Sequence, residues 1–324
     1  TVIARTEKSL AGQKALAEFT GLKNISTYPD SIANVASQIA EDVCIIDTSD
    51  GNRFVAGCVC SPSYWDLNKK IGQPLWNSLT ITGVIEAKGR VLCDLEAPDF
   101  QQIIVDDISQ TCTGHLHKGL LYAHGADEGG DPAAPEFGAH DAMWFAARDL
   151  LFGADAYPLP EVPESISRPD TGRLMPQLPA GFEQLILMLM NVLMIEVRAE
   201  SFFSFCCEIM RDKDAFAARR EQAEEAASMV ERIRIDEAIH VGYLQTTVSE
   251  MRSFTFKTVD GGTISGKDLI DPIWEGMVHW HAVTQADFSK EQTRDTIRAQ
   301  LEAMPNGGKL FAEFDAMDDL AKAA

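Results

Sequence analysis

Glu237 and His240, in the segment DEAIH, have the residue types and the spacing of a metal-binding pair. In a helix, an i,i+3 spacing turns through about 300°, so both side chains project from nearly the same face. A carboxylate and an imidazole on one face suit iron, manganese or zinc. The pair therefore predicts one half of a metal site on a helix.

A second pair of carboxylates, Glu196 and Glu200, lies in an intensely apolar helical segment. The i,i+4 spacing puts them about 40° apart on one face, and buried carboxylates need a partner. Arg198 points about 200° away from Glu196 and cannot neutralise both. A metal ion would do so, and the alternative is an ordinary internal salt bridge with one of the arginines Arg148, Arg232 or Arg234.

Two histidine-containing segments add further candidates. In WEGMVHWH, Glu275 and His279 share a helix face at i,i+4, so they can complete a second half-site. The alternative is that His279 and His281 form hydrogen bonds in an aromatic-rich core around the neighbouring tryptophans. His140 and Asp141 open another helix and supply either a ligand or an N-cap. The predicted metal ligands are Glu196, Glu200, Glu237, His240, Glu275 and His279.

These ligands require long helices to position them. The apolar periodicity predicts helices over Ala180–Arg211, Ala215–Phe254 and Asp271–Ala286, with a hairpin or loop in TVDGGTISG between the last two. A shorter helix is expected over Phe137–Phe152, and an amphipathic one over Lys290–Met304. Four apolar side chains on these helices are candidates for pocket walls or simple core: Met190, Met194, Phe203 and Tyr243.

The first third of the chain has mixed character. Ser31–Ala40 is typical of a helix, and two pairs of β-branched runs predict short antiparallel strands. The strands are Asp42–Asp47 with Arg53–Cys60, and Ser78–Glu86 with Arg90–Leu95. The Gly-, Asp- and Ala-rich stretch His124–Pro135 is typical of a linker. The expected fold is mainly α, with an α+β region over residues 1–125, a helical bundle over residues 136–290 and a C-terminal helix and tail over residues 291–324.

Composition excludes some classes of partner. The 324 residues include 28 basic and 49 acidic ones, a net charge of −21, which disfavours nucleic acid and anionic membrane surfaces. The seven cysteines show no disulfide framework, and a reducing cytoplasm fits them best. The longest apolar run, Leu185–Ile195, is shorter than the roughly 20 residues of a spanning helix. We also see no export signal.

Residues 136–290 resemble the ferritin-like di-iron carboxylate family, in which glutamates and Glu-x-x-His pairs project into a helical bundle. The match rests on DEAIH and the glutamates of the preceding helix. The second Glu-x-x-His of that family is absent, because Glu275 and His279 are one residue further apart. The resemblance therefore implies one or two metal ions, or a variant arrangement of the kind seen among arylamine N-oxygenase relatives.

A second resemblance concerns the front of the chain. EDVCIIDTSDGNRFVAGCVCSPSYWDLNKKIGQPL, residues 41–75, is similar to a segment of the haem-dependent oxidative N-demethylases. It includes no assignable haem ligand, and His115 and His117 in GHLHKG match no motif of that family. This resemblance implies oxidative chemistry on amines.

The leading hypothesis is an O₂-dependent non-haem oxygenase or oxidase with one or two iron ions, or iron and manganese, acting on a small organic substrate. An external electron donor would supply reducing equivalents, and surplus apolar helix surface is compatible with a homodimer. A haem-linked oxidative N-demethylase-like protein and a non-catalytic ferritin-like binding module are the alternatives.

Overall fold

The computed structural model describes residues 72–131, 139–212, 215–304, 306–312 and 314. Its α-helices are α5 (Gln73–Gly89), α6 (Leu120–Gly129), α7 (His140–Phe152), α8 (Ala180–Arg211), α9 (Arg220–Ser253), α10 (Gly266–His279) and α11 (Gln285–Glu302). Short 3₁₀ turns lie at Arg90–Asp94, Phe100–Gln102, Thr113–Lys118 and Ala217–Arg219, and a π-helical turn, Trp280–Thr284, joins α10 to α11. The fold is mainly α, as predicted. The expected helix at 31–40 and strands at 42–47 and 53–60 lie outside the described residues.

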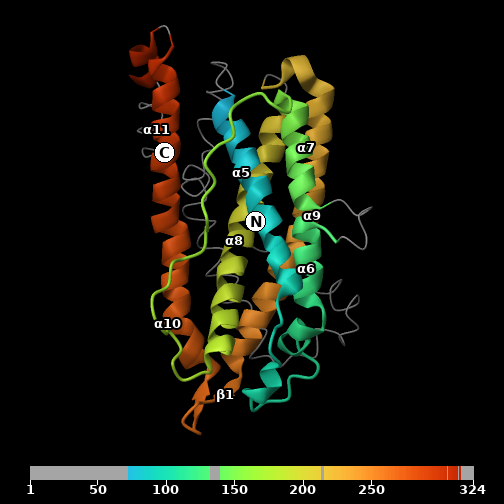
Figure 1. Ribbon diagram of the computed structural model, residues 1–324, viewed down its shortest axis with the longest axis vertical. Helices are drawn as coiled ribbons and strands as arrows, with labels where there is room; N and C mark the ends of the chain where they lie inside the picture. Colours follow the sequence, from blue (N-terminus) through green and yellow to red (C-terminus); the bar gives the residue numbers. More distant parts are fainter. Residues whose placement is uncertain (1–71, 132–138, 213–214, 305, 313, 315–324) are drawn as a thin grey trace.

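Four helices, α5, α7, α8 and α9, run along the long axis of the molecule (Figure 1), and α8 packs along α9 while α7 packs against both α5 and α9. A small hairpin, β1 (Thr255–Lys257) paired antiparallel with β2 (Thr263–Ser265), closes one end. This arrangement is compatible with a ferritin-like bundle. The hairpin confirms the interpretation of TVDGGTISG.

Helix α8 has the predicted bounds, Ala180–Arg211. It begins directly after Pro179, and its apolar side chains enter the interior along most of its length. Its length and hydropathy are also sufficient to cross a membrane, but 56% of its most apolar window is buried inside the fold. We therefore interpret it as a core helix of the bundle.

The prediction of strands over Ser78–Glu86 and Arg90–Leu95 is wrong, because these residues form α5 and the 3₁₀ turn after it. The β-branched residues favoured strands, but the hydroxyls of Ser78, Thr80 and Thr82 bond to carbonyls one turn back in the helix. Gly83 lets α5 approach α7, since a Cβ there would lie 2.7 Å from the ring of Phe145. Tertiary packing overrides the local preference.

The stretch His124–Pro135, interpreted as a linker, begins inside α6. Gly125 allows close packing, because a Cβ at this position would meet the backbone nitrogen of Cys93 at 2.7 Å. Gly119 before the helix and Gly130 after it have positive φ angles of 132° and 84°. Gly119 and Gly130 therefore mark the two ends of α6, and Gly125 allows the helix to pack closely. Whether residues 1–125 form a separate domain stays a prediction.

The interior divides into two large apolar clusters along the bundle. One includes Met194 on α8 and Tyr243 on α9, and the other includes Phe203 on α8 and Ile233 on α9. Met190, Met194 and Phe203 are fully buried core residues. On both α8 and α9, the residues between the two clusters carry buried charged groups, and these form the site described next.

Candidate metal centre

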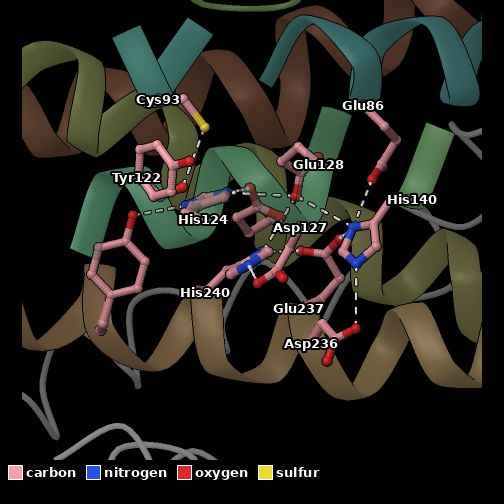
Figure 2. Close-up of polar contacts among 12 residues, drawn as sticks. Glu86, Cys93, Tyr122, His124, Asp127, Glu128, His140, Asp236, Glu237 and His240 are labelled. Atoms are coloured by element: carbon pink, nitrogen blue, oxygen red, sulfur yellow. Dashed lines mark hydrogen bonds and ion pairs between the residues drawn. The ribbon is translucent and has the colours of Figure 1, made fainter. Parts of the chain in front are cut away.

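Seven buried side chains, four glutamates and three histidines, converge in the middle of the bundle. They come from five helices, α5 to α9, and most of them are drawn in Figure 2. Burying so many ionisable groups together is costly unless each finds a partner. The cluster consists of Glu86, His124, Glu128, His140, Glu196, Glu237 and His240.

The first half of the cluster, the one-histidine group, consists of Glu86, Glu128, His140 and Glu237. Nδ1 of His140 lies 3.3 Å from Glu86 Oε2, 3.4 Å from Glu128 Oε1 and 3.2 Å from Glu237 Oε1. All four of these atoms are buried and lack a hydrogen-bond partner among the described residues. Four polar atoms therefore face one another around a common point.

The second half, the two-histidine group, consists of His124, Glu128, Glu196 and His240. Nε2 of His124 lies 3.1 Å from Glu196 Oε1 and 3.5 Å from Glu128 Oε1. Nδ1 of His240 lies 3.3 Å from the same Glu128 oxygen. The two imidazole rings stack with their centroids 3.8 Å apart. Both rings thus direct one nitrogen toward the carboxylates.

Two carboxylates connect the groups. Glu128 Oε1 belongs to both, because it faces His140 in one and both imidazoles in the other. Glu237 directs Oε1 to His140 Nδ1 and Oε2 to His240 Nδ1, at 3.2 and 3.0 Å. Carboxylates placed in this way can bridge two adjacent cations.

The spacing of these atoms fits metal coordination. Metal–ligand bonds of about 2.0–2.2 Å, the length for His and carboxylate ligands on zinc, place neighbouring ligand atoms roughly 3.0–3.5 Å apart. The measured separations from His140 Nδ1, 3.2 to 3.4 Å, fall in that range. The atoms of each group all lie within 4.8 Å of one another. Each group is therefore compact enough for one ion.

The outer nitrogen of each imidazole is also engaged (Figure 2). His240 Nε2 lies 3.2 Å from Asp127 Oδ2, and His140 Nε2 lies 3.5 Å from Asp236 Oδ2. His124 Nδ1 lies 2.7 Å from the hydroxyl of Tyr243, which is buried. Metal-bound histidines almost always use their second nitrogen in this way, because the contact fixes the tautomer and the ring orientation.

Burial and mutual repulsion divide the four carboxyl groups into two kinds. Burial raises the pKa of Glu86, with Glu128 adding to it, and burial raises the pKa of Glu196, with Glu237 adding to it. Burial alone would also raise the pKa of Glu128, but its close contacts with the three histidines hold it well below its usual range. The pKa of Glu237 is lowered against burial by its contact with His240. In the metal-free cluster, protons therefore prefer Glu86 and Glu196.

The histidines divide as well. Burial alone would lower the pKa of His140, but Asp236 and the cluster carboxylates raise it well above its ordinary value. For His240, burial is likewise overcome, chiefly by the charge of Glu237. The pKa of His124 is lowered by burial and by His240. The metal-free cluster thus holds its cationic protons on His140 and His240.

Electroneutrality favours two divalent ions. Four ionised glutamates carry four negative charges, which two divalent cations balance while all three imidazoles stay neutral. The cations would then replace the protons on Glu86, Glu196, His140 and His240. Charge and geometry therefore both allow metal to bind in this cluster, and Glu128 and Glu237 are the residues that contact both ligand groups.

The structure brings together three of the six predicted ligands, Glu196, Glu237 and His240. It places the other three elsewhere. Glu200 forms a two-bond ion pair with Arg234, the alternative that the sequence left open. Glu275 and His279 lie on the exposed face of α10, outside both groups.

The remaining histidines lie apart from the cluster. His281 is buried, with Nδ1 3.3 Å from Arg198 and Nε2 3.3 Å from Asn191, and its ring packs against Trp280. This confirms the hydrogen-bonded alternative for His281. His115 contacts the carbonyl of Thr111, and His117 is exposed. Asp141 makes no cap contact with α7 beyond its neighbour Ala142.

Sequence reasoning missed Glu86, His124 and Glu128, and it ranked His140 low. His124 and Glu128 are spaced i,i+4, a signal as good as that of Glu275 and His279. The glycines around them suggested a linker instead. Glu86 ends a run of β-branched residues that predicted a strand, so its place on a helix was not visible.

Comparison with known proteins adds one finding. Residues 7–80 match the family described as haem-dependent oxidative N-demethylase, alpha subunit-like. This confirms the resemblance inferred for residues 41–75. No curated protein and no solved structure matches the chain, so the resemblance to the ferritin-like family has no support from comparison. The match ends before the first residue of the metal cluster, Glu86.

The ion pair of Glu200 gives a test of the site boundary. We expect Glu200→Gln to keep the metal content of the wild type and to cost about 1 kcal/mol or less of unfolding free energy, as for other partly exposed pairs. Glu196→Gln, one turn away on the same helix, should lose metal. Elemental analysis of both purified variants and their denaturant unfolding check this. Equal metal loss in the two variants would contradict the assignment of Glu196 to the metal centre and of Glu200 to the ion pair.

Proposed function

We propose that the protein is an O₂-dependent oxidoreductase with a non-haem dinuclear centre of iron, or of iron and manganese, acting on a small organic substrate. The observation that carries the proposal is the sharing of Glu128 Oε1 between the two ligand groups. Carboxylates and imidazoles with open positions suit iron and manganese sites that bind dioxygen. When bound, these ions supply the electrons that dioxygen accepts.

The chain itself contributes orientation and exclusion of water. Asp127, Asp236 and Tyr243 hold the three imidazoles through their outer nitrogens. Apolar side chains lie along the bundle on both sides of the cluster, including Met194 and Ile233. A dry, pre-oriented site suits reactive oxygen chemistry because it limits side reactions with water.

An open surface groove on α7 and α9, the helices that carry His140 and Glu237, is the candidate site for a small-molecule substrate. It has a volume of about 400 Å³ and is lined largely by apolar residues of α7 and α9, among them Ala142, Met143 and Met229. Ala142 follows His140 by two residues, and Arg232 at the groove precedes Asp236 by one turn. We propose this side as the route of approach to the one-histidine group.

The remaining assignments are part of the same proposal. Insertion of one oxygen atom with reduction of the other to water consumes two electrons, so an external donor is proposed. The described cysteines form no disulfide with one another, which fits a cytoplasmic location. A homodimer is also proposed.

Anaerobic loading of metal-free protein with Fe²⁺ tests the function. We expect about two iron ions per chain, uptake of dioxygen on exposure to air, and weak near-ultraviolet absorption without a Soret band. Protein that folds normally but binds no metal would refute the dinuclear centre. Protein that binds metal but consumes no dioxygen would favour the binding-module alternative.

The family match favours a second candidate, a haem-linked oxidative N-demethylase-like protein. The matched residues 7–80 contain no histidine and no methionine, so a haem held by this segment alone would require cysteine or tyrosine as its protein ligand. Titration of the purified protein with haemin tests this directly. A stoichiometric Soret band that disappears when Cys44, Cys58 and Cys60 are replaced by serine would support the haem candidate.

The contact between Tyr243 and His124 gives a further prediction. With Nε2 of His124 facing a metal, Nδ1 carries the proton and donates it to the Tyr243 oxygen. We expect Tyr243→Phe to weaken metal binding by about tenfold, the lower range for losing such a partner. Competition with a chromophoric chelator measures this. Tyr122→Phe, an exposed tyrosine on α6, is the control and should leave the affinity unchanged.

A further inference from the structure

The two ligand groups differ in the number of nitrogen atoms that they offer. The one-histidine group supplies a single imidazole nitrogen, from His140, among carboxylate oxygens. The two-histidine group supplies two, from His124 and His240. Glu128 and Glu237 contact both groups, and Glu86 and Glu196 give each group one further carboxylate. The remaining difference is one additional imidazole in the two-histidine group.

Ligand composition decides which ion each position prefers. Carboxylates suit hard ions such as Mn²⁺ and Mg²⁺, whereas imidazole shifts preference toward later ions, and Fe²⁺ follows Mn²⁺ in the general affinity order. A second imidazole therefore increases the selectivity for Fe²⁺ over Mn²⁺. The one-histidine group, with a single imidazole, discriminates less against Mn²⁺.

Orientation acts in the same direction. The imidazoles of the two-histidine group have close outer contacts, 2.7 Å from His124 to Tyr243 and 3.2 Å from His240 to Asp127. His140 has only a 3.5 Å contact to Asp236. Outer contacts of this kind change metal affinity by about 10- to 100-fold. The two-histidine group is therefore better prepared for its ion before the ion arrives.

We infer that the two-histidine group binds Fe²⁺ first and more tightly, while the one-histidine group accepts Mn²⁺, so that the cluster is built to hold two unlike ions. This inference rests on the proposed function, because it requires both groups to bind metal. It goes further by assigning an order and an identity to the two positions.

Crystals of protein loaded anaerobically with one equivalent each of Fe²⁺ and Mn²⁺ test the assignment. Anomalous scattering at the iron and manganese edges measures the occupancy of each ion at each position without any assay of activity. We expect the Fe-to-Mn ratio in the two-histidine group to exceed that in the one-histidine group by about tenfold or more. His124→Gln, which removes one of the two nitrogens, should reduce that excess.

The possible outcomes distinguish a failure of this inference from a failure of the proposed function. Manganese in the two-histidine group, or the same mixture in both groups, would overturn the inference and leave a dinuclear centre standing. A cluster that takes up neither ion at saturating metal, in protein with a native circular dichroism spectrum, would overturn both. Glu86→Gln is the matched variant, since it should reduce only the manganese peak.

Discussion

Glu128→Gln is expected to remove both metal ions from the protein. Its Oε1 faces all three cluster histidines, so exchanging the charged carboxylate for a neutral amide weakens both ligand groups at once. The affinity for each ion should fall by more than about 100-fold, beyond the upper range for losing an outer contact. Elemental analysis after loading with Fe²⁺ or Mn²⁺ measures the effect.

The matched control is Glu275→Gln, which changes a glutamate that shares a helix face with a histidine but is exposed. It should retain both ions. Glu86→Gln is a graded comparison, because Glu86 belongs to the one-histidine group alone and should leave one ion bound. Two ions retained in Glu128→Gln would show that the two groups do not share a ligand. Circular dichroism of the metal-free variants establishes that each has folded.

The sequence was most informative where the chemistry lies within one long helix. The bounds of α8 were predicted to the residue because an apolar run of helical period follows directly after Pro179. Glu237 and His240 were found because i,i+3 spacing places two side chains together on any helix. Both inferences require only local geometry.

The ligands on the shorter helices were missed for a different reason. Glu86 and Glu128 lie in segments whose local preferences, for strand and for loop, are overridden by packing. Gly83 and Gly125 look like flexible positions in a sequence, yet each is a point where two segments approach closely. Only the assembled bundle distinguishes a glycine that permits packing from one that ends a helix.

The sequence also does not reveal which face of a helix is buried. Glu275 and His279 share a face of α10, but Ile273 and Met277 on another face enter the core. The pair is therefore well spaced and wrongly oriented for the cluster. Glu200 lies one turn from Glu196, and the difference between ion pair and cluster depends on Arg234 of the neighbouring helix. Whether a glutamate joins an ion pair or the cluster therefore depends on residues of the neighbouring helix.

Metal should stabilise the folded protein strongly, and more so as pH rises. Each ion present at about 100 times its dissociation constant adds about 2.7 kcal/mol, so two ions add roughly 5 kcal/mol of unfolding free energy. The measurement is denaturant unfolding of Mn²⁺-loaded and chelator-treated protein at about pH 6 and about pH 8. Glu237 contacts His140 through one carboxylate oxygen and His240 through the other. Glu237→Gln, which replaces one of these oxygens by an amide NH₂ and removes the negative charge, should show little gain from metal.

The sign of the pH effect follows from the groups that exchange protons for metal. Glu86, Glu196, His140 and His240 have raised pKa values in the metal-free fold. Their protons compete with metal at low pH, so binding tightens as pH rises. The same four groups favour the metal-free fold at low pH, since it binds protons more strongly than the unfolded chain, and that contribution is lost as pH rises. The pKa of His124 is lowered, so near the ordinary histidine pKa this residue changes the stability of the metal-free fold in the opposite direction. It is one group against four. The stabilisation by metal must therefore be larger at the higher pH, and a larger gain in acid would contradict the placement of these protons.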